Sequence, residues 1–355
     1  MRLFARLVAA LAALCLAVAA HAAGNPHRIV AIGDLHGDYA AYLEIVKAAG
    51  VADAKGRWTG RDTVLVQMGD VPDRGPDTRK IIEHLQKLQA AAARAGGKVV
   101  TLVGNHEAMN VVGDLRYVTE AEFAAFRTKA SKTTRDKLFE AYKKDLIEFY
   151  RRTDPAITES QARAKWFAET PLGKFEQRRA WSPTGAIGAW VVDHPAIVKI
   201  GDTLFVHGGI SVETAARPLE TVNAEVRAEL AKGESQAQSI LTDPLGPLWY
   251  RGNVARDDPA PAADGTFTPA RPSIAEELDR VLAAYGAKRL VVAHTPNLSG
   301  ILATEGGRLL RVDTGISGYY GGARSFLEID DGVAVAHKQG ADGNWTSEAL
   351  PQPGG

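Results

Sequence analysis

The sequence predicts an α/β protein in which parallel strands are joined by helices. From residue 27 to residue 103, short apolar runs alternate with segments of helical periodicity, as parallel strands with crossover helices require. After residue 289, short apolar runs are separated by glycine-rich turns, which favours a second sheet with more antiparallel pairing. In folds of this class, ligands bind beyond the carboxyl ends of the parallel strands.

The first elements of the chain follow a strand–helix order. Strands are predicted at residues 27–33 (HRIVAIG), 62–69 (DTVLVQMG) and 98–103 (KVVTLV), because each segment holds a run of buried-type residues. Helices are predicted between them, at residues 39–49 and 78–94.

The pattern then changes over residues 114–180, which are rich in charge and lack a convincing strand. Thr158 and Gln161 have the spacing of a capping box. Two or three amphipathic helices are therefore expected, and we interpret the segment as an inserted helical cap. Its apolar residues at helical spacing are Leu138, Tyr142, Leu146 and Phe149.

The rest of the chain returns to alternating elements. Helices are predicted at residues 213–231 and 274–285. No pattern continues beyond residue 340, so residues 341–355 are expected to form a flexible tail. The predicted strands are 196–200, 203–207, 289–293, 309–312, 325–329 and 333–337.

The N-terminus has the features of a signal peptide. Arg2 and Arg6 precede an apolar run at 7–20, and small residues flank His21 at the expected cleavage point. The run is shorter than the roughly 20 residues that a membrane span needs. We expect cleavage after Ala22, which removes residues 1–22, exports the chain to the periplasm or medium, and leaves no stable membrane insertion.

Composition excludes several classes of protein. The chain has 42 basic and 42 acidic residues, so it has no excess of positive charge for binding nucleic acid. A hydrophobic content of 45% excludes a disordered chain. The single cysteine, Cys15, lies in the expected signal peptide, so neither a disulfide framework nor a cysteine nucleophile is expected in the mature chain.

Potential metal ligands stand where the predicted strands end. The first three strands are followed by the segments 33–37 (GDLHG), 69–75 (GDVPDRG) and 104–107 (GNHE), and two later strands end at His207 and His294. Any one of these residues has an ordinary explanation as a helix cap or a turn residue. Their joint occurrence at five strand ends instead predicts a metal cluster at one edge of the sheets.

These segments, followed by His-Gly-Gly and a late His-Thr, resemble the calcineurin-like metallophosphoesterase superfamily, and within it the phosphoprotein phosphatases. Residues 110–117 (NVVGDLRY), 247–252 (PLWYRG) and 313–322 (DTGISGYYGG) are similar to the bacterial-type Shewanella-like protein phosphatases. The resemblance implies a four-layer αββα sandwich, with two mixed sheets flanked by helices. Residues 23–340 would form this single catalytic domain, with the cap inserted at 114–180.

The resemblance also implies a site for two divalent metal ions. Mn²⁺ is the first expectation, while Fe and Zn²⁺ suit the same mixture of ligands. Two ions bring four positive charges and two aspartates cancel two, so the site keeps a positive excess that suits a phosphate dianion. Asp70 would bridge the two ions. The implied ligands are Asp34, His36, Asp70, Asn105, His207 and His294.

Further residues complete the implied chemistry. Arg74, Asn105 and Arg251 would bind the phosphate, since a guanidinium matches two phosphoryl oxygens. His106 would protonate the leaving group as general acid, oriented by Asp73.

The resemblance thus implies a phosphomonoesterase of protein phosphatase type, acting on phosphotyrosine or phosphoserine/threonine by direct attack of a metal-bound hydroxide. Its substrate would be a phosphorylated peptide, protein or small phosphomonoester. Two alternatives stay open at this point: a diadenosine polyphosphate or nucleotide hydrolase of the same superfamily, and a non-catalytic binding protein. The oligomeric state is not predicted.

Overall fold

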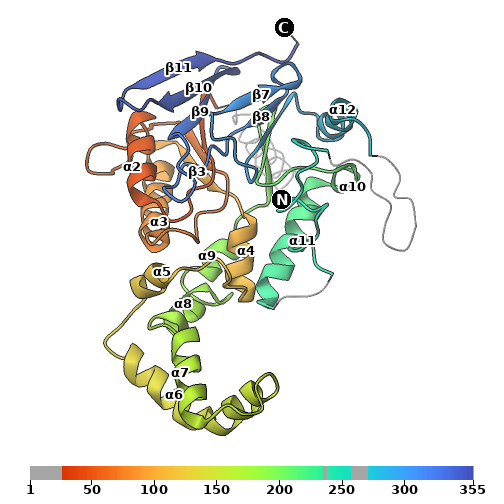
Figure 1. Ribbon diagram of the computed structural model, residues 1–355. Coiled ribbons are helices and arrows are strands. Elements are labelled where there is room, and N and C mark those ends of the chain that lie inside the picture. The colour runs from red at the N-terminus through yellow and green to blue at the C-terminus, as the bar shows by residue number, and fades with distance from the viewer. Residues whose placement is uncertain (1–25, 235–237, 257–270, 355) are drawn as a thin grey trace, which may run out of the picture.

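The computed structural model describes residues 26–234, 238–256 and 271–354 and consists of two stacked sheets with helices on their outer faces (Figure 1). Helices α2 (Tyr39–Ala48) and α3 (Thr78–Ala95) lie on one side, and α11 (Leu219–Lys232) and α12 (Ile274–Tyr285) on the other. This is the predicted four-layer α/β arrangement. The predicted signal peptide and its cleavage point lie outside the described residues.

The first sheet has six strands in the order β11-β10-β9-β1-β2-β3. Its β1, β2 and β3 are parallel, and β9, β10 and β11 add to β1 as antiparallel neighbours. The bounds are β1 (Arg28–Ile32), β2 (Val64–Gln67), β3 (Lys98–Thr101), β9 (Ser325–Asp330), β10 (Val333–Gln339) and β11 (Trp345–Ala349).

The second sheet has five strands in the order β4-β5-β6-β8-β7, and it too is mixed. Its central β5, β6 and β8 are parallel, whereas β4 and β7 pair antiparallel at the edges. Two mixed sheets were predicted and are confirmed, but the second sheet does not have the more antiparallel pairing that was expected, because the late antiparallel strands join the first sheet through β9 and β1. The bounds are β4 (Ile197–Ile200), β5 (Thr203–Val206), β6 (Arg289–Val292), β7 (Leu302–Thr304) and β8 (Leu309–Arg311).

Alternation along the strands separates the apolar residues between the two sheets from those under the helices on the outer faces. In β1, Ile29 and Ala31 face the layer between the sheets, while Val30 and Ile32 face the helices. In β6, Val291 likewise contributes to the layer between the sheets. A strand buried on both faces is a continuous apolar run, which is the pattern of HRIVAIG.

The inserted segment forms four helices where two or three were expected. They are α5 (Glu120–Ala125), α6 (Ser131–Arg151), α7 (Glu159–Glu169) and α8 (Lys174–Trp181). The capping box of Thr158 and Gln161 is present at the start of α7. In Figure 1, α6 and α7 project away from the sheets, whereas α8 lies beside α4 (Asn105–Val112), with which it is in contact.

The predicted apolar stripe of α6 is not its buried face. Tyr142 and Phe149 are 57% and 59% exposed, whereas Phe139 and Tyr150 are buried. The ring of Phe139 packs against those of Trp166 and Phe167 in α7. The neighbouring helix, and not the spacing within α6, therefore determines which side is covered.

Two other predictions differ from the structure. The predicted helix at 213–231 is divided into α10 (Val212–Ala215) and α11, with Pro218 preceding the second helix. The expected flexible tail contains β11, which pairs with β10, and the following Leu350 is buried. A helix α9 (Gly188–Val192) also precedes β4. None of the described helices is long and apolar enough to cross a membrane.

Candidate metal centre

The ends of five strands bring the predicted metal ligands to one edge of the two sheets. Asp34 and His36 follow β1, Asp70 follows β2, and His207 and His294 follow β5 and β6, while Asn105 begins α4 directly after β3. All six side chains are at most 6% exposed. Residues up to 260 positions apart in the chain, from Asp34 to His294, thus share one buried site.

The loops that carry these residues are bonded to one another. The Glu107 carboxylate accepts hydrogen bonds from the backbone N–H groups of Gly104, Asp70 and Val71, each at 2.8 Å. Gly69 has a φ of 93°, and a Cβ there would lie 2.7 Å from the backbone nitrogen of Gly104. Glycine is required at this position because the two loops approach so closely.

Backbone carbonyls orient two of the histidines. His36 Nδ1 donates to the carbonyl of Pro72 at 3.0 Å, and His207 Nδ1 donates to that of Met68 at 2.9 Å. In both rings the Nε2 atom is therefore unprotonated in the neutral form and free to act as a ligand. A histidine that ligates a metal commonly donates its other N–H in this way.

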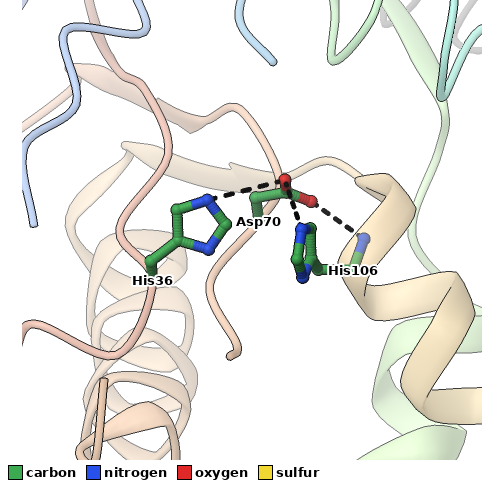
Figure 2. Close-up of side chains that lie close together, drawn as sticks. All are labelled: His36, Asp70 and His106. Atoms are coloured by element: carbon green, nitrogen blue, oxygen red, sulfur yellow. Dashed lines mark hydrogen bonds and ion pairs between the residues drawn. The ribbon is translucent and has the colours of Figure 1, made fainter. Parts of the chain in front are cut away.

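The ligating atoms form two clusters that share Asp70. The first contains His36, Asp70 and His106; His36 Nε2 and His106 Nε2 lie 3.9 and 3.8 Å from Asp70 Oδ2 (Figure 2). The second contains Asp70, His207 and His294. Asp34 adds a carboxylate to the first cluster, with its Oδ2 3.9 Å from His36 Nε2.

In the second cluster, several potential metal-ligand atoms lie close to His207 Nε2. His207 Nε2 lies 3.0 Å from Asn105 Oδ1, 3.2 Å from His294 Nδ1 and 3.4 Å from Asp70 Oδ2. The other ring nitrogen of His294, Nε2, is buried and has no hydrogen-bond partner among the described residues. Such a collection of nitrogen and oxygen donors suits a divalent cation.

The site also contains buried carboxyl groups, whose ionised forms need a nearby positive charge. Burial, together with Asp313 and Asp70, raises the pKa of Asp34 well above its usual range. Burial raises the pKa of Glu107 to about 7 and that of Asp313 to about 6. Burial opposes ionisation of Asp70 as well, but His207 and His106 hold its pKa well below the usual range.

Burial favours the neutral form of two of the histidines although Asp70 opposes it; burial also lowers the pKa of His207, but Asp70 and Glu107 raise it above its ordinary value overall. Burial lowers the pKa of His36 to about 3, and burial with His207 and Arg251 nearby lowers that of His294 to about 2. Neutral imidazole is the form that binds metals. The donor set and its charge therefore fit two divalent ions, one on each side of Asp70.

His106, a member of the first cluster, forms a buried pair with Asp73. His106 Nδ1 donates to Asp73 Oδ2 at 2.5 Å, which leaves Nε2 facing Asp70. Although burial lowers the pKa of His106, Asp70 and Asp73 raise it above its ordinary value overall. The arrangement can hold a protonated imidazole at the site.

The predicted phosphate-binding arginines lie on two sides of the site. The Arg74 guanidinium lies 4.8–5.1 Å from the ring centres of Tyr117, Tyr319 and Tyr320. Arg251 is exposed, and its Nη1 donates to the carbonyl of His294 at 2.9 Å and to Thr295 Oγ1 at 2.8 Å.

Two residues of the site were not assigned from the sequence. Asp313 follows β8, is 2% exposed and accepts from the N–H of Gly315 at 2.9 Å. The strand-end rule that led to the other ligands would have found it. Asn110 lies inside α4 and is fully buried beside Asp73. No local pattern distinguishes it, because its partner is 37 positions away.

Comparisons with known proteins agree with this geometry. The chain is 33% identical over 328 residues to Shewanella-like protein phosphatase 2 of Arabidopsis thaliana, covering 88% of this chain and 78% of that protein. It is 27% identical to Shewanella-like protein phosphatase 1 of Plasmodium berghei (strain Anka), covering 86% and 72%.

A solved structure is similar as well. The cold-active protein-tyrosine phosphatase of a psychrophilic Shewanella species matches with a TM-score of 0.63 and 26% identity, over 91% of this chain and 80% of that one. The family model described as calcineurin-like phosphoesterase matches residues 27–298, which include every predicted metal ligand. The family match covers most of this chain, and Shewanella-like protein phosphatase 2 of Arabidopsis thaliana is 33% identical over 88% of it. This protein therefore belongs to the calcineurin-like phosphoesterase family.

Proposed function

We propose that this protein is an exported phosphomonoesterase of protein phosphatase type that uses two divalent metal ions, with Mn²⁺ as the expected metal. The observation that carries the proposal is the pair of buried histidine–carboxylate clusters sharing Asp70, the first of which includes His106 in its pair with Asp73. Asp34, His36 and Asp70 would hold one ion. Asp70, Asn105, His207 and His294 would hold the other.

Each remaining polar group has a role in the proposal. When bound, two divalent ions would neutralise phosphoryl charge and lower the pKa of a coordinated water molecule. Arg74, Arg251 and the Asn105 amide bind the phosphoryl oxygens. His106 gives the proton on Nε2 to the leaving oxygen, while Asp73 fixes its ring through Nδ1.

Aromatic substrates are favoured by the surroundings of Arg74. Tyr117 and Tyr319 are 39% and 64% exposed beside the arginine that would bind the phosphate. Their rings offer a surface for the ring of phosphotyrosine, and aromatic pairs of this kind contribute about 0.5–1.5 kcal/mol. The solved structure named as a protein-tyrosine phosphatase supports the same preference.

The test is a substrate panel on purified protein supplied with Mn²⁺, Fe²⁺ or Zn²⁺. Phosphotyrosine, phosphoserine and phosphothreonine peptides are compared with p-nitrophenyl phosphate and diadenosine tetraphosphate. Hydrolysis of the phosphotyrosine peptide with the highest kcat/KM is expected. Asp70→Asn and His106→Asn should each lower kcat by about 100-fold or more, with Arg179→Ala as the control. A protein inactive on every phosphomonoester with all three metals would refute the proposal.

Export is tested separately, by expressing the full chain in a bacterial host and sequencing the N-terminus of protein from the periplasm. Recovery of a mature chain that begins at Ala23 is expected. Intact protein confined to the cytoplasm would contradict the proposal of export without bearing on the activity.

A further inference from the structure

A row of buried polar side chains connects the inserted helices to the His106–Asp73 pair. Gln177 in α8 donates from Nε2 to Asn110 Oδ1 at 2.6 Å, and Asn110 in α4 donates from Nδ2 to Asp73 Oδ1 at 2.9 Å. The other Asp73 oxygen accepts from His106 Nδ1. Gln177, Asn110 and Asp73 are fully buried, and His106 is 3% exposed.

Chemistry determines the direction of every bond in this row. An ionised carboxylate only accepts, so the Asn110 amide must turn its NH₂ group toward Asp73. Its carbonyl oxygen then points to Gln177, which must donate. The same Asn110 NH₂ group donates to the carbonyl of His106 at 3.0 Å. Reversal of either amide would bring like groups together, so the row has one favourable arrangement.

The insertion also holds the backbone of α4. Arg178 Nη1, next to Gln177, donates to the carbonyl of Asn110 at 2.6 Å. From α5, Glu122 is buried close to Asp73, and burial with Asp73 nearby raises the pKa of this carboxyl well above its usual range. One helix of the insertion, α5, therefore lies close to Asp73, and a second, α8, reaches it through Asn110.

We infer that the inserted segment positions the general acid, with Gln177 acting through Asn110 to hold Asp73 and thereby His106. The inference rests on the proposed role of His106 and assigns Gln177 and Asn110 as positioning residues. Within the described part of the chain, no side-chain hydrogen bond joins either residue to a predicted metal ligand. Without the Gln177 donor, the Asn110 carbonyl oxygen loses its buried partner, so the amide is held less tightly and Asp73 then holds the His106 ring in a wider range of angles.

The leaving group of the substrate distinguishes positioning from simple structural support. p-Nitrophenolate departs without a proton, whereas a phenol with a pKa of about 10 needs general-acid assistance. A misplaced His106 therefore slows phenyl phosphate much more than p-nitrophenyl phosphate. Loss of packing alone would slow both substrates equally, or lower only the thermal stability.

The experiment measures kcat for a series of substituted phenyl phosphates with the full Mn²⁺-loaded protein. Gln177→Leu removes the amide with little change in volume, and Gln177→Met keeps the length without an amide. Each should lower kcat for phenyl phosphate by about tenfold and for p-nitrophenyl phosphate by less than about twofold. Arg179→Ala, an exposed residue of the same helix, is the matched control and should match the wild type.

The outcomes separate the inference from the proposed function. His106→Asn should show the steepest dependence on leaving-group pKa. Suppose that His106→Asn shows this dependence, but that both soluble Gln177 variants either keep the wild-type slope or slow both substrates equally. The inference about Gln177 is then wrong, while the proposed function stands. If His106→Asn itself keeps the wild-type slope, the general acid has been misassigned and the inference falls with it. Thermal unfolding identifies a variant that fails to fold. The kcat values of the other Gln177 variant then test the inference.

Discussion

Single residues at the site hold backbone conformations that most side chains avoid. His36, Asp70, Asp73, Arg74 and His294 have φ values between 43° and 73°. A non-glycine residue in this region costs of the order of 1–3 kcal/mol when the surrounding structure forces it. The bonds from Glu107 to neighbouring loops oppose relaxation of the turn that contains Asp70. Five strained residues in one site are typical of a functional centre.

The contribution of Arg74 depends on its shape as well as its charge. Its planar guanidinium lies over three tyrosine rings, a geometry that an ammonium group does not reproduce. Arg74→Ala is expected to lower kcat/KM for a phosphotyrosine peptide by about 100- to 1,000-fold, and Arg74→Lys to recover only part of this loss. Steady-state kinetics of both variants tests this prediction. A lysine variant with the kcat/KM of the wild type would contradict it.

His194, which is not one of the predicted site residues, should make stability depend on pH. It is 7% exposed and packs edge-on against Trp190, and burial lowers its pKa to about 3. The unfolded chain takes up this proton below about pH 6.5, whereas the native chain does not. The free energy of unfolding should therefore fall as pH decreases from about 6.5 toward 3.

Replacement of His194 isolates this effect. His194→Gln should remove up to about 1.4 kcal/mol per pH unit from the slope of unfolding free energy against pH in that window. Urea unfolding of both proteins at several pH values between 7 and 4 measures the difference. Parallel curves would show that His194 is not buried in its neutral form.

At the scale of elements, α4 links the metal centre to the insertion. The helix begins at Asn105, so one end of it contributes a predicted metal ligand and the predicted general acid. Its third residue, Glu107, bonds back to the N–H of Gly104 and to the loop after β2. Its later turn carries Asn110 toward α8. A single short helix thus determines the relative positions of three functional groups.

The last strand stabilises the first sheet at its edge. β11 covers β10, Leu350 is buried, and Gln352 Oε1 accepts from Arg289 Nη2 at 2.9 Å. Truncation after Gly340 should lower the free energy of unfolding by about 3 kcal/mol or more and expose the β10 edge to aggregation.

The kcat of the folded fraction of this truncated chain should stay unchanged, because none of these residues lies among the predicted ligands. Thermal unfolding and light scattering measure the two effects. A chain truncated after Gln352 keeps every contact named above and serves as the control. Equal stability of the two chains would show that the C-terminal strand contributes nothing.

For the molecule as a whole, a formal net charge of zero conceals a strongly acidic centre. Asp34, Asp70, Glu107 and Asp313 are all buried within one site. Buried acidic groups are costly unless cations or protons compensate them. The folded state therefore offers divalent ions a site that has no equivalent in the unfolded chain, and the ions should stabilise the fold.

Removal of metal should lower the melting temperature and abolish activity together. Chelation of the Mn²⁺-loaded protein, followed by differential scanning calorimetry and readdition of Mn²⁺, measures both. At 100 times its dissociation constant, an ion contributes about 2.7 kcal/mol. Asp34→Asn should raise the stability of the metal-free chain and reduce the gain on adding Mn²⁺. An unchanged melting temperature after complete chelation would contradict metal binding at this centre.

The sequence alone was sufficient for the α/β class, for helix α12, and for the residues at five strand ends. Each of these is encoded locally: apolar runs define strands, and the residue after a strand lies at the sheet edge whatever the remaining topology. The family resemblance added the proposed roles of those residues. Segments such as GDVPDRG can therefore be assigned to the metal centre because each directly follows a predicted strand.

Tertiary structure alone decided which sheet receives the late strands, which side of α6 is covered, and that the C-terminal segment is a strand. It also decided the contact of Gln177 with Asn110 and of Asn110 with Asp73, pairs that lie 67 and 37 positions apart. The physical reason is the same in each case. A local pattern specifies what a residue needs, such as burial or a hydrogen-bond partner, but the partner is supplied by a distant segment whose position depends on the packing of the whole chain.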